Sequence, residues 1–172
     1  MSNSIPVHLR EEQAAVEAEI RSAFRDVTRA GGVSWSEAEV IDRTWGDESE
    51  QAAARAKDAE LRWEDLVESP TWSHESGMGG FTFLDPIGFR YYLAPAMIRC
   101  LRDGDVGGLV LHLAGHGKFC RSKFSVFTAV QSRVVARFLR LMVDVERSFE
   151  LPPQTMLADA LEYWSTRGSG PD

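Results

Sequence analysis

Two histidines and a cysteine have the spacing that most resembles a metal site. His112, His116 and Cys120 follow one another at intervals of four residues, which places side chains on one face of a helix. Imidazole and thiolate groups are the usual ligands of zinc. Gly115 and Gly117 interrupt the helix that this arrangement needs, and no fourth ligand is close in the sequence. We therefore predict no bound metal and no cofactor, and keep the three residues only as weak candidates.

Patterns typical of phosphate binding or catalysis are incomplete. The glycines of 77–80 lack the Lys-Ser/Thr pair of a P-loop and the preceding strand of a dinucleotide-binding fold. His74 and Glu75 stand beside Trp72, and a histidine with a carboxylate is a pairing used in acid–base catalysis. A solvated surface loop explains these residues more simply. An enzyme or small-ligand binder that uses the Trp72–Asp85 loop is therefore the alternative function, and a protein without catalytic activity is favoured.

Arg90 and Tyr91 are candidates for binding. Arg90 can hold an anion, or the carboxylate of a partner, through two parallel hydrogen bonds. It can equally form an internal ion pair with Glu64 or Asp65, which we favour because a buried arginine is usually paired. Tyr91 lies beside it, outside the apolar stripe that contains the next tyrosine.

The net charge of the chain makes some classes of binding partner less favourable than others. The 172 residues carry a formal charge of -7, which disfavours nucleic acid and anionic membrane surfaces. The charge is uneven, since residues 1–90 contain 18 acidic and 9 basic residues, whereas residues 91–172 contain 8 and 10. Arg133, Arg137 and Arg140 share a helical face and would be the surface for nucleic acid, but the net charge argues against that function.

The acidic half combines carboxylates with tryptophan. Complementary charge speeds encounter, and a few aromatic anchors hold a complex together. We therefore predict a module that binds a basic protein and, in its narrowest form, an antitoxin-like immunity protein that neutralises that partner. The predicted binding face consists of Glu50, Asp58, Glu64, Asp65 and Glu68, with Trp63 or Trp72 as the anchor.

Apolar residues recur at helical spacing along most of the chain. Capping boxes mark helix starts at Ser34–Glu37 and Thr128–Gln131. Asp85 marks another, because aspartate caps a helix and the following proline is tolerated at its first position. Helices are expected over about 10–28, 34–45, 49–67, 86–101, 107–117 and 128–149, with a last one after the prolines at 152 and 153.

Two segments are expected to depart from regular helix. Phe81–Leu84 has the residue types of a short strand or extended run. Pro95 falls inside the helix that Asp85 starts and is expected to bend it. The predicted fold is therefore all-α, a single bundle of about six helices with room for one short extended hairpin segment.

Length and composition suit one domain over residues 1–172, with loose tails over about 1–8 and 167–172. No stretch approaches the roughly 18 apolar residues of a membrane span. The two cysteines do not form a disulfide framework. We therefore expect a cytoplasmic protein that does not enter a membrane.

One segment has a family resemblance. Residues 83–93 read Phe-Leu-Asp-Pro-Ile-Gly-Phe-Arg-Tyr-Tyr-Leu. They resemble a signature, Phe-Leu-Thr-Pro, two residues, then Phe-Arg-Tyr-Tyr-Leu-Pro-Ala, of small bacterial proteins classed as a domain of unknown function. Residues 124–131 with Phe138-Leu139 are similar to the closing helix of that family. This chain has Asp85 in place of Thr and an additional Ala94 before Pro95. The resemblance implies a mostly helical bacterial protein and no particular activity.

Overall fold

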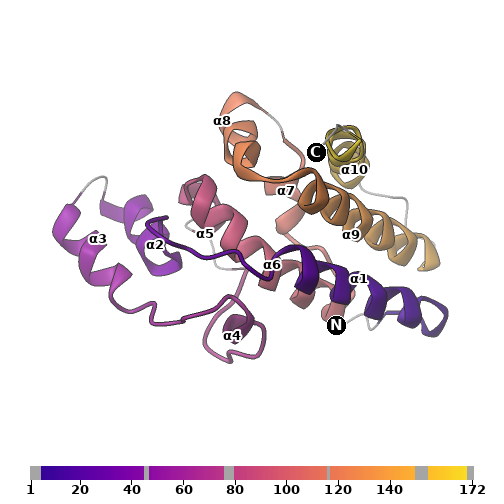
Figure 1. Cartoon of the computed structure of the whole chain (residues 1–172), viewed down its shortest axis with the longest axis horizontal. Helices are drawn as coiled ribbons and strands as arrows, with labels where there is room; N and C mark the ends of the chain where they lie inside the picture. The colour runs from indigo at the N-terminus through magenta and orange to yellow at the C-terminus, as the bar shows by residue number, and fades with distance from the viewer. Residues whose placement is uncertain (1–4, 45–46, 76–79, 116, 150–154, 170–172) are drawn as a thin grey trace.

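Helices are the only regular elements in the described part of the chain. The computed structural model describes residues 5–44, 47–75, 80–115, 117–149 and 155–169 (Figure 1). These ranges contain ten α-helices and two short 3-10 helices. The all-α class is therefore confirmed. The predicted count of about six is wrong, because several short helices replace segments that were expected to be long helix or extended chain.

The helices follow one another with short connections. The first half contains η1 (Val7–Leu9), α1 (Arg10–Ala23), α2 (Trp35–Thr44), α3 (Glu48–Arg55), α4 (Glu64–Val67) and α5 (Gly80–Phe83). The second half contains α6 (Pro86–Asp103), α7 (Leu109–Leu113), α8 (Gly117–Ser122), η2 (Lys123–Val126), α9 (Ala129–Ser148) and α10 (Thr155–Gly168).

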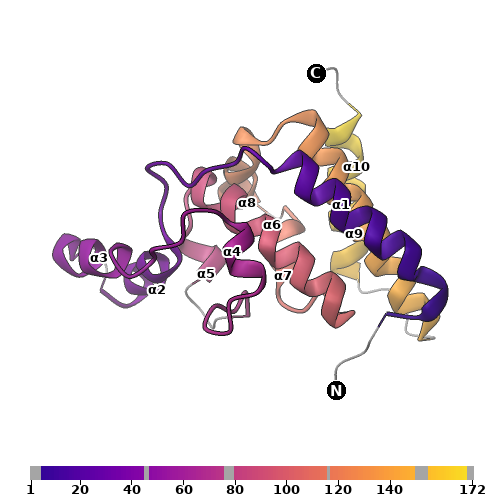
Figure 2. The ribbon, with the colours of Figure 1, turned by 60° about the horizontal axis from the view of Figure 1, so that its bottom comes forward.

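Helix α6 forms the centre of the core. Asp85 caps it by accepting a hydrogen bond from the Gly88 N–H at 2.8 Å, as its sequence predicts. The helix continues through Pro95 and ends at Gly104, whose φ of 68° is readily adopted only by glycine. The proline therefore does not end the helix, and its predicted bend stays a prediction. Twelve of the 18 residues of α6 are buried, and α1, α4 and α9 pack against the helix (Figure 2).

Helix α9 is the long amphipathic helix beside this centre. Thr128 and Gln131 form the predicted capping box at its start. It packs against α1 on one side and α10 on the other, and most of its predicted apolar stripe is buried. Val130, which was assigned to that stripe, is 45% exposed. Within the described residues, no helix has both the length and the apolar character needed to span a membrane.

The segment predicted to be extended is helical instead. Phe81 lies in α5, a single turn whose last carbonyl groups have no partner within the helix. The ammonium of Lys123 donates hydrogen bonds to the carbonyls of Phe81 at 2.8 Å and Thr82 at 2.6 Å. A residue about 40 positions away therefore stabilises this turn, which local sequence patterns do not indicate.

Two predicted helices of the first half are shorter than expected, and so is the one expected over about 107–117, which extends only over Leu109–Leu113. The first ends at Ala23 rather than near residue 28, although Phe24 and Val27 beyond it are still buried. The third, expected over 49–67, is divided into α3 and α4 by an irregular segment over residues 56–63. Both changes place acidic residues in connecting segments, and the second of these segments forms part of the candidate site.

Candidate functional site

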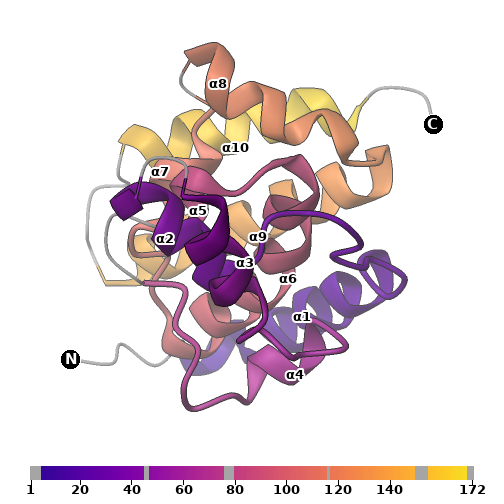
Figure 3. The ribbon, with the colours of Figure 1, turned by 90° about the vertical axis from the view of Figure 1, so that its left-hand side faces the viewer.

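A pocket of about 500 Å³ opens at the end of the molecule formed by α2, α3 and α4, which faces the viewer in Figure 3. It lies between the start of α2, the segment 57–60, α4 and the segment 69–73. We call it the acidic pocket. Its functional groups are the carboxylates of Glu39, Asp58, Glu60 and Asp65, the indoles of Trp35 and Trp72, and one cation, Lys57.

Two of these carboxylates are held in place by internal contacts. Asp58 accepts hydrogen bonds from the Ser36 N–H at 2.8 Å and from its hydroxyl at 2.7 Å. Glu60 accepts one from the Tyr92 hydroxyl at 2.8 Å. The Arg29 guanidinium lies 3.8 Å from the Asp58 carboxylate and 3.7 Å from that of Glu60. One guanidinium therefore faces two carboxylates, so this group keeps a net negative charge.

Tyr92 connects the pocket to the core. Its hydroxyl accepts hydrogen bonds from the Trp35 N–H at 3.0 Å and from Arg29 at 3.2 Å, and donates to Glu60. These three bonds use the full capacity of a hydroxyl group. Burial, together with the charge of Glu60, raises the pKa of Tyr92, so the phenol stays neutral. The rings of Trp35 and Trp72 pack against it, with centroids 5.3 and 6.3 Å away.

The residues before α2 form a hydrogen bond and close backbone contacts with the start of α6. These contacts position the start of α2, which forms one wall of the pocket. Asp85 accepts a second hydrogen bond, from the Val33 N–H at 2.9 Å. The two backbones approach so closely that a Cβ on Gly88 would lie 2.3 Å from the Val33 carbonyl oxygen, and one on Gly32 would lie 2.8 Å from the Gly88 nitrogen. Glycine is therefore required at both positions by space.

The predicted capping box of α2 is present and has a further partner. The Ser34 N–H donates to Glu37 at 3.0 Å, and the Glu37 N–H donates to the Ser34 hydroxyl at 3.4 Å. Arg55 of α3 forms a bidentate ion pair with the same Glu37, with both distances 2.9 Å. The cap thus also joins α3 to α2, which fixes the outer side of the site.

The structure brings together only part of the predicted binding face. Asp58, Asp65 and Trp72 line the acidic pocket. Trp63 does not, because it is fully buried and donates its indole N–H to the Phe24 carbonyl at 2.9 Å. Trp72 is only 8% exposed. The expectation of an exposed tryptophan anchor is therefore corrected: Trp63 belongs to the core, and Trp72 contributes a wall of the pocket.

The other predicted carboxylates lie apart from the pocket. Glu64 forms an ion pair with Arg62, and Glu68 forms one with Arg102 at 2.6 Å, which lowers the pKa of the Glu68 carboxyl group. Glu50 lies exposed in α3. The helix expected over residues 49–67 is divided into α3 and α4, so the five predicted acidic residues do not form one continuous helix face.

Arg90 and Tyr91 are internal. The Arg90 guanidinium donates a hydrogen bond to the backbone carbonyl of Val126 at 2.7 Å and, in the described part of the chain, pairs with neither Glu64 nor Asp65. The favoured ion pair is therefore wrong. Tyr91 is 1% exposed, and burial raises the pKa of its hydroxyl.

The weak metal candidates are not assembled in the described structure. His112 is half-buried against the Phe81 ring, and burial, with the charge of Lys123, lowers its pKa to about 4. Cys120 is a free cysteine, and His116 lies outside the described residues. No group of three metal-ligating side chains occurs among the described residues.

The loop considered for the alternative function, an enzyme or small-ligand binder, contains one histidine that contacts a buried cysteine. The His74 Nε2 lies 3.4 Å from the Cys100 sulfur, and its Nδ1 is buried without a hydrogen-bond partner. Burial lowers the pKa of His74 and raises that of the Cys100 thiol, so both groups are held neutral. A neutral, buried thiol is a poor nucleophile. Residues 76–79, including three of the residues considered for phosphate binding, lie outside the described residues.

Several site residues were missed by sequence reasoning. Glu39 and Glu60 show no spacing that distinguishes them from other surface acids, and Tyr92 was assigned only to an apolar stripe. Trp35 lies inside the capping box, which could have directed attention to this helix start. The other pocket residues can be identified only from the tertiary structure, because the lining comes from four separate segments of the chain.

Comparisons with known proteins give a family and no activity. The model of a family of unknown function (DUF6714) matches residues 12–168, which include the whole acidic pocket. Because this match covers most of the chain, the chain belongs to that family. No curated protein and no solved structure matches the chain.

Proposed function

We propose that this member of the family is a protein-binding module whose acidic pocket receives a lysine or arginine side chain of a basic partner. The observation that carries the proposal is the composition of the lining. Four carboxylates surround a pocket whose nearby cations are Lys57, Arg29 and Arg99, the last of which donates hydrogen bonds to the carbonyls of Leu66 and Trp72. A positive side chain entering the pocket would therefore be attracted by an excess of negative charge.

The aromatic wall supports the same kind of guest. Trp35 and Trp72 are held edge-on to each other, with ring centroids 5.3 Å apart. Guanidinium and ammonium groups bind favourably to indole rings, and the gain is larger where water is partly excluded. The Arg99 guanidinium already lies over the Trp72 ring, 5.0 Å from its centroid, so a guest shares this wall with an internal cation. The buried indole N–H of Trp72 has no hydrogen-bond partner among the described residues. The pocket thus offers carboxylates for the charge and rings for the side-chain stem.

Charge distribution supports association with a whole basic protein. The excess of acids in residues 1–90 extends the negative field beyond the pocket and would speed encounter with a positive surface. In its narrowest form, the module is an antitoxin-like immunity protein that covers basic functional residues of a toxic partner. Binding of a single basic side chain in the acidic pocket is the part of this proposal that can be tested without knowing the partner.

A single guest side chain provides the test. N-acetyl-arginine amide and N-acetyl-lysine amide would be titrated into the protein while the indole N–H signals of Trp35 and Trp72 are followed by NMR. We expect saturable shifts with a Kd on the order of 1 mM, as suits one side chain. Combined Glu39→Gln and Asp65→Asn substitutions should weaken binding about five- to tenfold. A matched control removes two acids elsewhere, through Glu11→Gln and Glu12→Gln in α1.

Two results would contradict the proposal. Shifts that are equal for the pocket variant and the α1 control would show a general charge effect rather than binding in the pocket. An absence of saturable shifts with either amide, at concentrations up to tens of millimolar, would remove the pocket as a receptor for basic side chains.

A further inference from the structure

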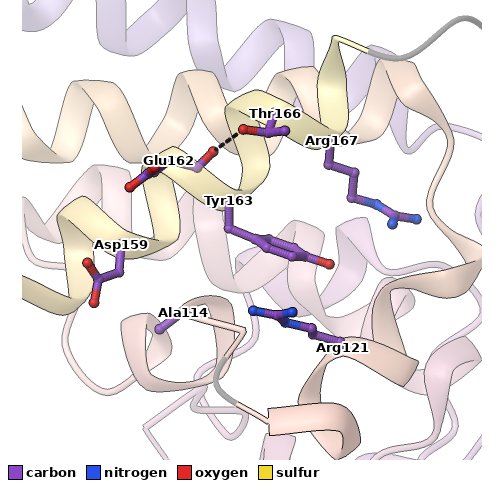
Figure 4. Close-up of a pocket in the computed structure, with 7 residues that line it drawn as sticks. All are labelled: Ala114, Arg121, Asp159, Glu162, Tyr163, Thr166 and Arg167. Carbon is purple, nitrogen blue, oxygen red and sulfur yellow. Dashed lines mark hydrogen bonds between the residues drawn. The ribbon is translucent and has the colours of Figure 1, made fainter.

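A second pocket, of about 550 Å³, is lined by residues from the second half of the chain (Figure 4). It is formed by one face of α10, the end of α7 and a residue of α8. Its volume is in the range of pockets that hold small molecules. The charged and polar groups that line it are Arg121, Asp159, Glu162, Tyr163, Thr166 and Arg167.

The ring of Tyr163 divides this lining into two ends. Its position is fixed by the core, since the ring packs against Phe124 and Trp164 with centroids 5.6 and 5.8 Å away. Asp159 and Glu162 lie on one side of the ring in Figure 4, and the hydroxyl points away from them. The pocket is therefore not uniformly charged, although two basic and two acidic residues line it.

The basic end presents positioned guanidinium groups. Arg121 donates from Nε to the Gly115 carbonyl at 2.9 Å, and its guanidinium lies 5.4 Å from the centroid of the Tyr163 ring. Arg167 donates from Nη2 to the Phe124 carbonyl at 2.6 Å. These bonds hold both side chains while leaving the Arg121 Nη1 and Nη2 without partners among the described residues. Such groups are suited to bind a carboxylate.

The acidic end lies one to two turns earlier in α10. Glu162 is exposed, and its side chain forms no hydrogen bond or ion pair within the described residues. Asp159 lies three residues earlier in the same helix. At 1.5 Å per residue, Glu162 and Arg167 are about 7.5 Å apart along the axis, close to the roughly 7 Å that an extended dipeptide spans. A ligand with opposite charges at its two ends matches this separation, whereas a simple anion would meet repulsion from the acids.

We propose that this pocket binds a small zwitterion of the length of a dipeptide. The ligand carboxylate lies at Arg121, Arg167 and the Tyr163 hydroxyl, and the ligand ammonium lies at Glu162. The site is separate from the acidic pocket and is lined by none of its residues.

A set of related probes tests the two ends separately. L-alanyl-L-alanine carries both charges, its N-acetyl form carries only the carboxylate, and its amide carries only the ammonium. We expect calorimetry to show saturable binding of the zwitterion and about tenfold weaker binding of each singly charged form.

Substitutions assign the binding to the pocket. Arg121→Gln and Tyr163→Phe should weaken binding of the zwitterion, with little change for the amide probe, because both residues contact the carboxylate end. Glu162→Gln should show the reverse pattern against the N-acetyl probe. Arg140→Gln, an exposed arginine on α9, is the matched control and should bind as the unmodified protein does. Thermal melting of each variant confirms that it is folded.

Three outcomes would overturn the proposal. Equal binding of the charged and capped probes would show that the charges are not recognised. Inorganic phosphate that binds more tightly than every zwitterion would make this a simple anion site. No saturable binding of the dipeptide up to about 10 mM, a range that covers weak affinities, would leave the pocket without the proposed ligand.

Discussion

Asp85 should be a key residue for stability, because one carboxylate oxygen serves two helices. The Oδ1 atom accepts from the Gly88 N–H at 2.8 Å, which caps α6, and from the Val33 N–H at 2.9 Å, just before α2. Asp85→Ala removes both acceptors at once. Loss of an N-cap costs about 0.5–2 kcal/mol. A part-buried N–H left without its acceptor costs about 1–3 kcal/mol more.

The expected loss for Asp85→Ala is therefore about 2–4 kcal/mol in the free energy of unfolding, since the two contributions add only partly. Asp85→Asn is the matched control. It keeps an oxygen of the same geometry that can accept both bonds, and asparagine is as good a cap as aspartate. We expect the Asn variant to lose less than about 1 kcal/mol.

Urea unfolding followed by tryptophan fluorescence measures both variants. The alanine variant should shift the midpoint to lower urea with an unchanged slope, because the native structure is retained. The reasoning is refuted if alanine costs less than about 0.5 kcal/mol, a change within the usual range for surface substitutions. It is also refuted if asparagine costs as much as alanine, since the negative charge rather than the shared acceptor would then matter.

Two further predictions concern close packing and pH. Gly88→Ala should destabilise the protein severely, because the new Cβ would lie 2.3 Å from the Val33 carbonyl oxygen, whereas Gly31→Ala, with nothing within 4 Å, should change the melting temperature little. A melting temperature for Gly88→Ala near that of Gly31→Ala would contradict the close approach. His112 has a folded pKa of about 4, below its ordinary value of 6.5, because it is buried and lies near the charge of Lys123. Its neutral form therefore contributes stability above pH 6.5 that is lost as pH falls toward 4, up to about 3 kcal/mol. Urea unfolding across this interval should show a flatter pH dependence for His112→Gln, and an unchanged slope would show that His112 is not the titrating group.

Signals confined to a few neighbouring residues were sufficient for much of the fold. Both capping boxes and the Asp85 cap occur where the sequence predicts them, because each needs only a side chain and a backbone N–H three residues away. The apolar stripes of α1, α6 and α9 are mostly buried for the same reason, since their spacing repeats with the helix.

The acidic pocket and the short helices depended on contacts between distant residues. Helix α5 is stabilised by the hydrogen bonds of Lys123. Glu60, in the irregular segment between α3 and α4, accepts a hydrogen bond from the hydroxyl of Tyr92, which is 32 residues further along the chain. No spacing in the sequence marks these pairs, because a carboxylate or an ammonium meets its partner only after the helices have packed.

Composition and local patterns thus determined that this is an acidic, all-helical chain, where several of its helices begin, and which faces enter the core. Only the tertiary structure decided that Trp63 is a core residue, that Trp72 forms a wall of the acidic pocket, and that Asp58 and Glu60 share one guanidinium. The physical reason is that periodicity reports burial of a whole helix face, whereas a binding site is formed by the few side chains that separate segments bring together.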